Sequence, residues 1–586
     1  MPWTQIIDPL KNLPLSALVA AIPIIFIFWS LMKKMKGYKT SLLALAIAIL
    51  IAILIYGMPF KLAMLSTLHG ALYGLFPICW IIISAVFLFN VTVKSGQFEV
   101  IKNFMASITP DRRLQALLIA FSFGAFLEGA AGFGAPVAIS GAMLVGLGFN
   151  PLYAAGLCLI ANTAPVAFGS VGTPILMASR MSDIPELAIS QMVGRTLPIL
   201  SLMLPLYLVV LMSGFKKSLE VLPAIIVSGF SFAFVQWFTS NYMGPMLPDV
   251  LAGIASIICL LLLLKYWKPK SIWRFKEEAA VHSESELKYS SLQILRAWSP
   301  FIIMTFFIVA WGLQPVKDVL NSIGFIKFQI PGLNGSLLKP DGSPLAIKAF
   351  DFNYLSAPGT AVILATLISI PLIGISFRES IKIFGATLKQ LMFPIITIAA
   401  VVGYAFVANY SGMSISMAVA LASTGALFPF FSPILGWLGV FLTGSDTSAN
   451  ALFSKLQSNT AHTLGFDPVV AVSANAAGGV TGKMISPQSI AVGAAAVGLI
   501  GKESDLFRFT VKHSFIMLFI ICVLTCLQVY VMKWIVPAYQ KIDATANTSA
   551  VAISNPNAGQ GFWYLLILVL AVGLIILSLS INKKKI

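Results

Sequence analysis

Long apolar stretches with almost no charge constrain this chain more than any other feature of its sequence. A helix needs about 20 apolar residues to cross a bilayer. Only 10% of the 586 residues are charged and the mean hydropathy is +0.92, whereas a soluble domain carries about 25% charged residues. Thirteen stretches are long enough to span, at residues 13–32, 41–59, 66–92, 150–178, 186–213, 219–240, 245–264, 297–314, 358–377, 390–409, 467–500, 510–537 and 561–581. The sequence therefore predicts an all-α polytopic membrane protein embedded in a lipid bilayer.

Interruptions within the apolar sequence predict helices that do not cross the membrane in one piece. Two further apolar stretches, 114–149 and 432–465, have polar or glycine-rich centres, and we interpret each as a re-entrant hairpin. Glycine and proline interrupt the stretches at 150–178 and 467–500, which predicts two broken helices.

The basic residues indicate how the chain is oriented. Most of the 38 Lys and Arg residues fall in connections on one side of the predicted spans. By the positive-inside rule that side is cytoplasmic, so we expect a bacterial cytoplasmic membrane protein with its N-terminus outside and its C-terminus inside. Because these residues follow the spans rather than one soluble face, the net charge of +17 does not indicate a nucleic-acid partner.

Short motifs recur in the same order in the two halves of the chain. LFPI at 75–78 recurs as MFPI at 392–395, FLEG at 126–129 as FLTG at 441–444, and LGFNP at 147–151 as LGFDP at 464–468. The charge rule places the copies in opposite orientations, which predicts an inverted-topology repeat, a layout of many secondary transporters. The predicted organisation is 1–60, N-terminal spans; 61–213, first repeat; 214–264, connecting spans; 265–296, cytoplasmic loop; 297–377, spans around an external loop at 315–356; 378–537, second repeat; and 538–586, an external loop and the C-terminal span.

Acidic residues are rare in the two predicted hairpins. Glu128 in FLEGAAGFGAP and Asp446 in FLTGSDTSANALF occupy near-equivalent positions of the repeats. A charge at membrane depth costs at least a few kcal/mol, so such a residue normally faces a cavity or a partner. We expect both acids to couple transport to protons; the competing interpretation is that they are protonated structural residues or cap a half-helix.

Polar and glycine residues next to these acids are the candidates for substrate binding. Glycines break the helix and let backbone approach a ligand, and the amides and hydroxyls at helix breaks favour a small carboxylate. The same groups could instead serve tight packing or satisfy broken backbone. Arg195 and Lys483 are cations inside predicted spans, and either could neutralise a substrate carboxylate or pair with an acid. The full candidate set is Gly129, Gly132, Gly134, Asn162, Thr163, Arg195, Thr443, Ser445, Thr447, Ser448, Asn450, Asn475 and Lys483.

Catalytic and cofactor motifs are absent from the sequence. It contains no H-E-x-x-H pattern, which is typical of zinc metalloproteases, and no G-x-S-x-G pattern, which is typical of serine hydrolases. It also contains no P-loop pattern, which binds nucleotide phosphates. We therefore expect neither an enzyme nor a bound cofactor or metal.

Three segments give the chain a family resemblance. FLEGAAGFGAPVAI (126–139), ANTAPVAFGSVGTPI (161–175) and GSDTSANALF (444–453) resemble those of the bacterial L-lactate permease family, as do the chain length and span layout. The resemblance implies proton-coupled uptake of L-lactate, and commonly of D-lactate and glycolate. It also implies the architecture of a wider transporter grouping whose members often form homodimers. The family supplies no residue roles.

The mechanism expected from the sequence carries one proton with each lactate anion. Burial of a carboxylate favours its protonated form, so Glu128 is the expected main proton carrier and Asp446 a second carrier or an orienting group. Lys483 or Arg195, with the helix-break amides and hydroxyls, would hold the substrate carboxylate and 2-hydroxyl. The alternatives are a sodium-coupled carboxylate carrier, a cation/proton antiporter on the same scaffold, and a channel or scaffold subunit.

Overall fold

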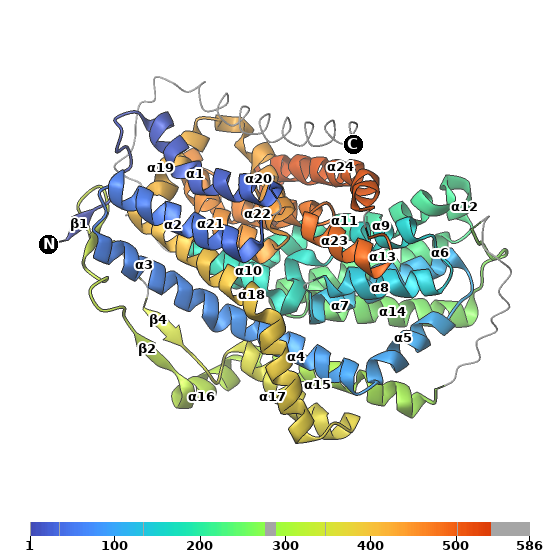
Figure 1. The fold of residues 1–586 in the computed structure, drawn as a ribbon. Helices are drawn as coiled ribbons and strands as arrows, with labels where there is room; N and C mark the ends of the chain where they lie inside the picture. The colour runs from blue at the N-terminus through green and yellow to red at the C-terminus, as the bar shows by residue number, and fades with distance from the viewer. Residues whose placement is uncertain are drawn as a thin grey trace.

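The computed structural model describes residues 2–540 apart from residues 34, 133, 276–288, 346, 348 and 501. The predicted span at 561–581, nearly all of the segment 538–586 and the middle of the loop 265–296 lie outside this part of the chain. The described residues are mostly helical (Figure 1).

The helices of the first half begin with three near the N-terminus and continue into the first predicted repeat. They are α1 (Leu13–Met32), α2 (Gly37–Leu54), α3 (Phe60–Tyr73), the π-helical turn η1 (Gly74–Cys79), α4 (Trp80–Lys94), α5 (Gln97–Ser107), α6 (Arg112–Gln115), η2 (Ala116–Phe123), α7 (Gly124–Ala130), α8 (Ala135–Gly146), α9 (Pro151–Ala161), η3 (Val166–Phe168), α10 (Gly169–Ser182), α11 (Glu186–Ser213), α12 (Phe215–Leu219), α13 (Leu222–Tyr242) and α14 (Pro248–Tyr266).

The second half contains the remaining helices and most of the short strands. The helices are α15 (Ser291–Gly312), α16 (Gln314–Gly324), α17 (Pro358–Ile373), α18 (Phe377–Ser411), α19 (Met413–Ala422), η4 (Gly425–Leu427), α20 (Phe428–Thr443), α21 (Asp446–Leu464), α22 (Pro468–Lys483), α23 (Pro487–Ala496), α24 (Glu503–Tyr530) and η5 (Lys533–Ile535). Strand β1 (Trp3–Thr4) pairs in parallel with β3 (Leu337–Leu338), and β2 (Ile326–Phe328) pairs antiparallel with β4 (Phe350–Phe352).

Within the described residues, ten helices are long and apolar enough to cross a membrane, or eleven when one bent pair counts as a span. The polytopic helical fold is therefore confirmed, but the number thirteen is not. The apolar part of α1, Leu13–Ile27, and the 16-residue α17 fall short of the length that such a span requires. The stretch 467–500 divides into α22 and α23, because Pro487 starts a new helix behind the N-cap Ser486.

Both stretches that were expected to be hairpins fold back on themselves. In the first, α7 ends at Ala130 and α8 packs back against α7 and η2. In the second, α20 and α21 pack against each other around a tip at Gly444 and Ser445, where Gly444 takes a left-handed φ of 70°. Each tip lies where the sequence places its polar or glycine-rich centre.

The stretch 150–178 is broken as expected. The pair formed by α9 and the η3–α10 segment bends by 65° at Asn162–Pro165, because the chain leaves the helix between Ala161 and Val166. Figure 1 shows α10 and α22 near the middle of the molecule, between β1 and α19 at one end and α5, α6 and α12 at the other.

The same order of elements occurs twice. After α4, the series runs α5, the helix ending in α7, α8, α9, a break, α10 and the 28-residue α11; after α18 it runs α19, α20, α21, α22, a break, α23 and the 28-residue α24. The short helices α5 and α19 both follow a left-handed glycine, Gly96 and Gly412. The element order supports the repeat, and its inverted orientation stays a prediction.

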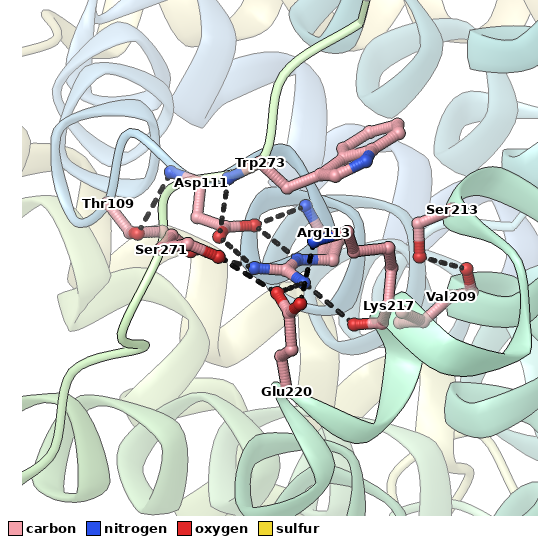
Figure 2. Close-up of polar contacts among 9 residues, drawn as sticks. All are labelled: Thr109, Asp111, Arg113, Val209, Ser213, Lys217, Glu220, Ser271 and Trp273. Atoms are coloured by element: carbon pink, nitrogen blue, oxygen red, sulfur yellow. Dashed lines mark hydrogen bonds and ion pairs between the residues drawn. The ribbon is translucent and has the colours of Figure 1, made fainter.

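A buried cluster joins three segments that the charge rule assigns to the cytoplasmic side. Arg113 pairs with Asp111 at 2.7 Å and with Glu220 at 2.9 Å, and it donates to the carbonyl oxygens of Lys217 and Ser271 at 2.7 and 2.9 Å (Figure 2). Lys217, Arg113 and Ser271 donate hydrogen bonds to the partly exposed Glu220 carboxylate, and they lower its pKa to about 2 because they stabilise the charged form. The base of the first hairpin is thereby tied to the α12–α13 connection and to the segment after α14.

The segments assigned to the external side also meet one another. Besides the β1–β3 pairing, the Gln5 amide donates to the carbonyl oxygens of Asn409 and Tyr410 at 2.9 and 3.0 Å. The N-terminus, the loop 315–356 and the end of α18 are therefore neighbours, in agreement with their common predicted side.

Candidate functional site

A buried ion pair joins the two repeats at the middle of the molecule. The Lys483 Nζ atom, in the last turn of α22, lies 2.5 Å from Oε1 of Glu128 on α7. Asn162, at the break after α9, donates from Nδ2 to Oε2 of the same carboxylate at 3.2 Å. Gly169 at the start of α10 lies against this carboxylate, since a Cβ there would come within 2.7 Å of Oε1. Helix breaks and hairpins from both repeats thus converge on Glu128.

Asp446 lies in the first turn of α21, immediately after the second hairpin tip. Its carboxylate is buried against Gly479 of α22, where a Cβ would come within 2.2 Å of Oδ1. Neither carboxylate oxygen accepts a hydrogen bond of good geometry among the described residues, although the Asn450 side chain lies beside this carboxylate. The charges of Lys483 and Glu128 act on Asp446, so the two predicted acids and the predicted cation form one electrostatic group.

A chain of amides connects the second hairpin to α22. Asn475 donates from Nδ2 to Oδ1 of Asn450 at 2.9 Å, and Gln457 donates from Nε2 to Oδ1 of Asn475 at 3.3 Å and to the Ser432 carbonyl at 2.8 Å. Two side-chain amide atoms near the acids, Asn450 Nδ2 and Asn162 Oδ1, are buried and make no hydrogen bond of good geometry among the described residues. One is a donor and the other an acceptor.

The predicted hydroxyl groups are largely engaged in local structure. Thr443 donates to the Gly439 carbonyl at 2.7 Å, Ser445 caps α21 by accepting the Ser448 N–H at 3.2 Å, and Thr163 donates to the Ile160 carbonyl at 2.7 Å. Thr447 differs from these residues, because its hydroxyl lies 3.3 Å from that of Thr173 on α10 and so bridges the two repeats.

The three glycines of the first hairpin make different contacts. Gly129 packs against Asp249 of α14, Gly132 takes a left-handed φ of 62° against Ser170, and Gly134 takes a φ of 84° beside Val492. All three serve close approach of neighbouring elements.

Arg195 lies apart from the Glu128 group. Its guanidinium donates to Oδ1 of Asn241 at 2.9 Å and to the carbonyl of Ile535 at 2.5 Å. Of the two cations proposed from the sequence, the structure therefore brings Lys483 and not Arg195 to the acids.

The sequence analysis missed Asp249 and Gln236, which lie beside this group. Asp249 is buried in the first turn of α14, Glu128 and Lys483 act on it electrostatically, and Gln236 of α13 donates to its Oδ1 at 3.4 Å. The sequence could have indicated Asp249, because it is an acid within the predicted span 245–264. An acid at membrane depth normally faces a cavity or a partner, and this holds for Asp249 as it does for Glu128.

Membrane-length helices in two repeated series, with a buried carboxylate–ammonium pair where interrupted helices meet, are typical of a secondary membrane transporter. The sequence relationships agree with this class and narrow it: a family model described as L-lactate permease matches residues 16–532. The chain belongs to the L-lactate permease family, whose members are permeases and not enzymes.

Three curated relatives are similar over nearly the whole chain. The L-lactate permease of Bacillus subtilis strain 168 is 54% identical, over 92% of this chain and 100% of its own length. The L-lactate permease of Escherichia coli K12 is 50% identical, over 91% and 100%. The glycolate permease GlcA of Escherichia coli K12 is 52% identical, over 90% and 98%.

Proposed function

We propose that this permease takes up L-lactate, together with D-lactate and glycolate, by proton symport. Relatives named for lactate and for glycolate are about equally similar to the chain, which supports a shared range of small 2-hydroxy monocarboxylates. The observation that carries the proposal is the buried Lys483–Glu128 pair at 2.5 Å.

The pair supplies a coupling step. When lactate binds, its carboxylate takes the Lys483 ammonium and leaves Glu128 without its cation. Breaking a buried ion pair from one side costs about 3–5 kcal/mol because a charge remains uncompensated. Glu128 avoids that cost by taking a proton, so one proton binds with each lactate and the loaded site keeps the charge of the empty one.

Polar atoms next to Glu128 and next to Asp446 match the rest of the substrate. Asn162 Oδ1 is an acceptor for the 2-hydroxyl hydrogen, and Asn450 Nδ2 is a donor for a carboxylate oxygen. Asp446, whose oxygens accept no hydrogen bond of good geometry among the described residues, serves as the second proton-binding residue. Asn475 and Thr447 hold the second hairpin against α22 and α10, and Gly169 leaves room for the Glu128 carboxylate.

Purified protein in proteoliposomes tests the proposal. Wild-type protein under an inward proton gradient without sodium should accumulate labelled L-lactate, and a protonophore should abolish the accumulation. The Glu128→Gln variant should lose proton-driven accumulation and keep part of its lactate–lactate exchange, which also shows that the variant is folded. Wild-type accumulation in Glu128→Gln would remove this residue from the coupling step, and no wild-type uptake of lactate or glycolate under any gradient would refute the substrate assignment.

Sodium coupling is the second candidate, and the free oxygens of Asp446 favour it. A carboxylate beside the polar tip residues of the second hairpin could bind a cation such as Na⁺ through oxygen ligands. Replacing sodium by choline in the same assay separates the two mechanisms: accumulation that requires sodium and survives collapse of the proton gradient would support this alternative.

We also propose that the N-terminus is outside and the C-terminus inside the bacterial cytoplasmic membrane. The meeting of β1 with β3 at one end and the Arg113 cluster at the other support a common side for the segments that the charge rule groups. Labelling of cysteines introduced at exposed positions of the loop 315–356 in intact cells tests the orientation. The homodimer implied by the family resemblance stays a prediction.

A further inference from the structure

Asp249 is a buried acid that has no role in the proposed coupling between Lys483 and Glu128. It lies in the first turn of α14, almost fully buried, with its Cβ directly against Gly129 of the first hairpin, where an added Cβ would come within 2.8 Å of it. Gly129 follows Glu128 in the sequence, so the two carboxylates are held on adjoining elements by close backbone packing.

The hydrogen bonds around Asp249 lead back to the break that holds Glu128. Gln236 donates from Nε2 both to Oδ1 of Asp249 at 3.4 Å and to the carbonyl oxygen of Ala164 at 3.0 Å. Ser201 donates to the Gln236 Oε1 atom at 2.8 Å, which turns the NH₂ group toward Asp249. Ala164 and Asn162, the donor to Glu128, belong to the same break between α9 and η3. One interrupted helix therefore contacts Glu128 directly and is linked to Asp249 through Gln236.

The charge balance around Asp249 is incomplete. The charged groups that act on it are Glu128 from α7 and Lys483 from α22, while η2 contains no ionisable residue and α13 contains only Tyr242, at its end. Lys483 is committed to Glu128, and the Oδ2 atom of Asp249 has no hydrogen-bond partner among the described residues. A buried carboxylate without a cation is held neutral by a proton.

We propose that Asp249 is a proton-binding residue of the permease that holds a proton in the state seen here and supplies it to Glu128 during transport. The inference rests on the proposed proton symport. When the substrate carboxylate takes Lys483, the proton leaves Asp249 and binds the newly uncompensated Glu128 carboxylate. Asp249 then takes a proton from the external water, and Glu128 releases its proton to the cytoplasmic side when lactate leaves and Lys483 pairs with it again. Each cycle therefore carries one proton inward and leaves both residues as they began.

The Asp249→Asn variant tests the proposal, because asparagine keeps the shape and still accepts from Gln236. In proteoliposomes, lactate–lactate exchange at equal pH should remain measurable, which shows that the variant is folded, whereas the initial rate of proton-driven uptake should fall about a hundredfold, the usual contribution of a positioned proton donor. Lactate binding should keep its wild-type pH dependence, since Glu128 is intact. In Glu128→Gln that pH dependence should disappear, which distinguishes the two roles.

Infrared difference spectroscopy gives a readout that does not depend on transport. Wild-type protein at neutral pH should show the C=O stretch of a protonated carboxylic acid that Asp249→Asn lacks, and Asp341→Asn, which changes an exposed loop residue bonded to Ser343, should retain it. An unchanged carboxylic-acid signal in Asp249→Asn, or proton-driven uptake at the wild-type rate, would overturn the proposal. Wild-type lactate uptake measured in the same vesicles shows independently whether the proposed function holds.

Discussion

Replacing Lys483 by methionine removes the cation of the central pair while keeping the length of the side chain. In the folded protein the Lys483 side chain is 11% exposed and that of Glu128 is 3% exposed, so neither group is screened by water. Glu128 must then either remain charged without a cation or bind a proton.

Protonation sets the upper limit of the cost. A glutamate carboxyl in water titrates near pH 4.3, so keeping Glu128 protonated at pH 7 costs about 3.7 kcal/mol, at about 1.4 kcal/mol per pH unit. Because the folded variant then binds a proton that the unfolded chain releases, its stability falls as pH rises above 4.3. We expect Lys483→Met to lose about 3–4 kcal/mol at pH 7 and about 1 kcal/mol at pH 5.

Unfolding by denaturant in mixed micelles at the two pH values measures both losses. The double variant with Glu128→Gln should recover most of the stability at pH 7 and lose the added pH dependence, since no buried charge remains. Lys455→Met is the matched control: its pair with Asp183 at 2.8 Å is 28% and 37% exposed, and an exposed pair contributes about 0–1 kcal/mol.

Equal losses for Lys483→Met at pH 5 and pH 7 would refute this reasoning, because a protonated Glu128 requires the difference. A double variant no more stable than Lys483→Met at pH 7 would show that the cost arises from lost packing and not from an uncompensated carboxylate.

Three further predictions concern positions around the site and at its margins. Gly169→Ala places a Cβ within 2.7 Å of the Glu128 carboxylate and should lower lactate uptake by at least about tenfold, whereas Gly385→Ala, which meets nothing within 4 Å, should leave uptake unchanged. Arg195→Gln should lower the midpoint of thermal unfolding, because Asn241 and Ile535 lose a donor, without changing the KM for lactate. Glu220→Gln should lower the unfolding midpoint at pH 7, and its difference from wild type should shrink as pH falls from 4.5 through about 2, because the depressed pKa of Glu220 stabilises the fold only while the carboxylate is charged.

Local chemistry explains why much of the fold could be predicted from the sequence. The break at Asn162–Pro165 and the hairpin tip at Gly444 follow from proline and glycine within apolar stretches, and the structure places both there. The number of spans was harder to predict from the sequence. Pro487 divides the apolar stretch 467–500 into two short helices, α22 and α23, and α17 is only 16 residues long. Hydropathy alone does not distinguish a short buried helix from one that crosses the membrane.

Glu128 and Asp446 could be predicted from the sequence, but the residues that pair with them could not. Glu128 and Asp446 stand out because carboxylates are rare at membrane depth. Lys483 and Arg195 were both candidates from the sequence. The fold brings Lys483 across 355 residues of sequence to Glu128, whereas Arg195 donates to the carbonyl of Ile535, 340 residues away. The prediction covered the acids of the two hairpins, whereas Asp249 lies in the predicted span 245–264, to which the same rule applies.

The presence of Lys483 as the shared cation has a consequence for the energetics of uptake. In the proposed cycle the empty site holds an ammonium and a carboxylate from the protein, and the loaded site holds the ammonium, the lactate carboxylate and a protonated Glu128. Both forms carry the same charge, so neither reorientation step moves charge through the membrane field, which would otherwise contribute about 2.3 kcal/mol per charge per 100 mV. The membrane voltage then leaves the transport rate unchanged, and the lactate and pH gradients alone determine how much substrate the cell accumulates.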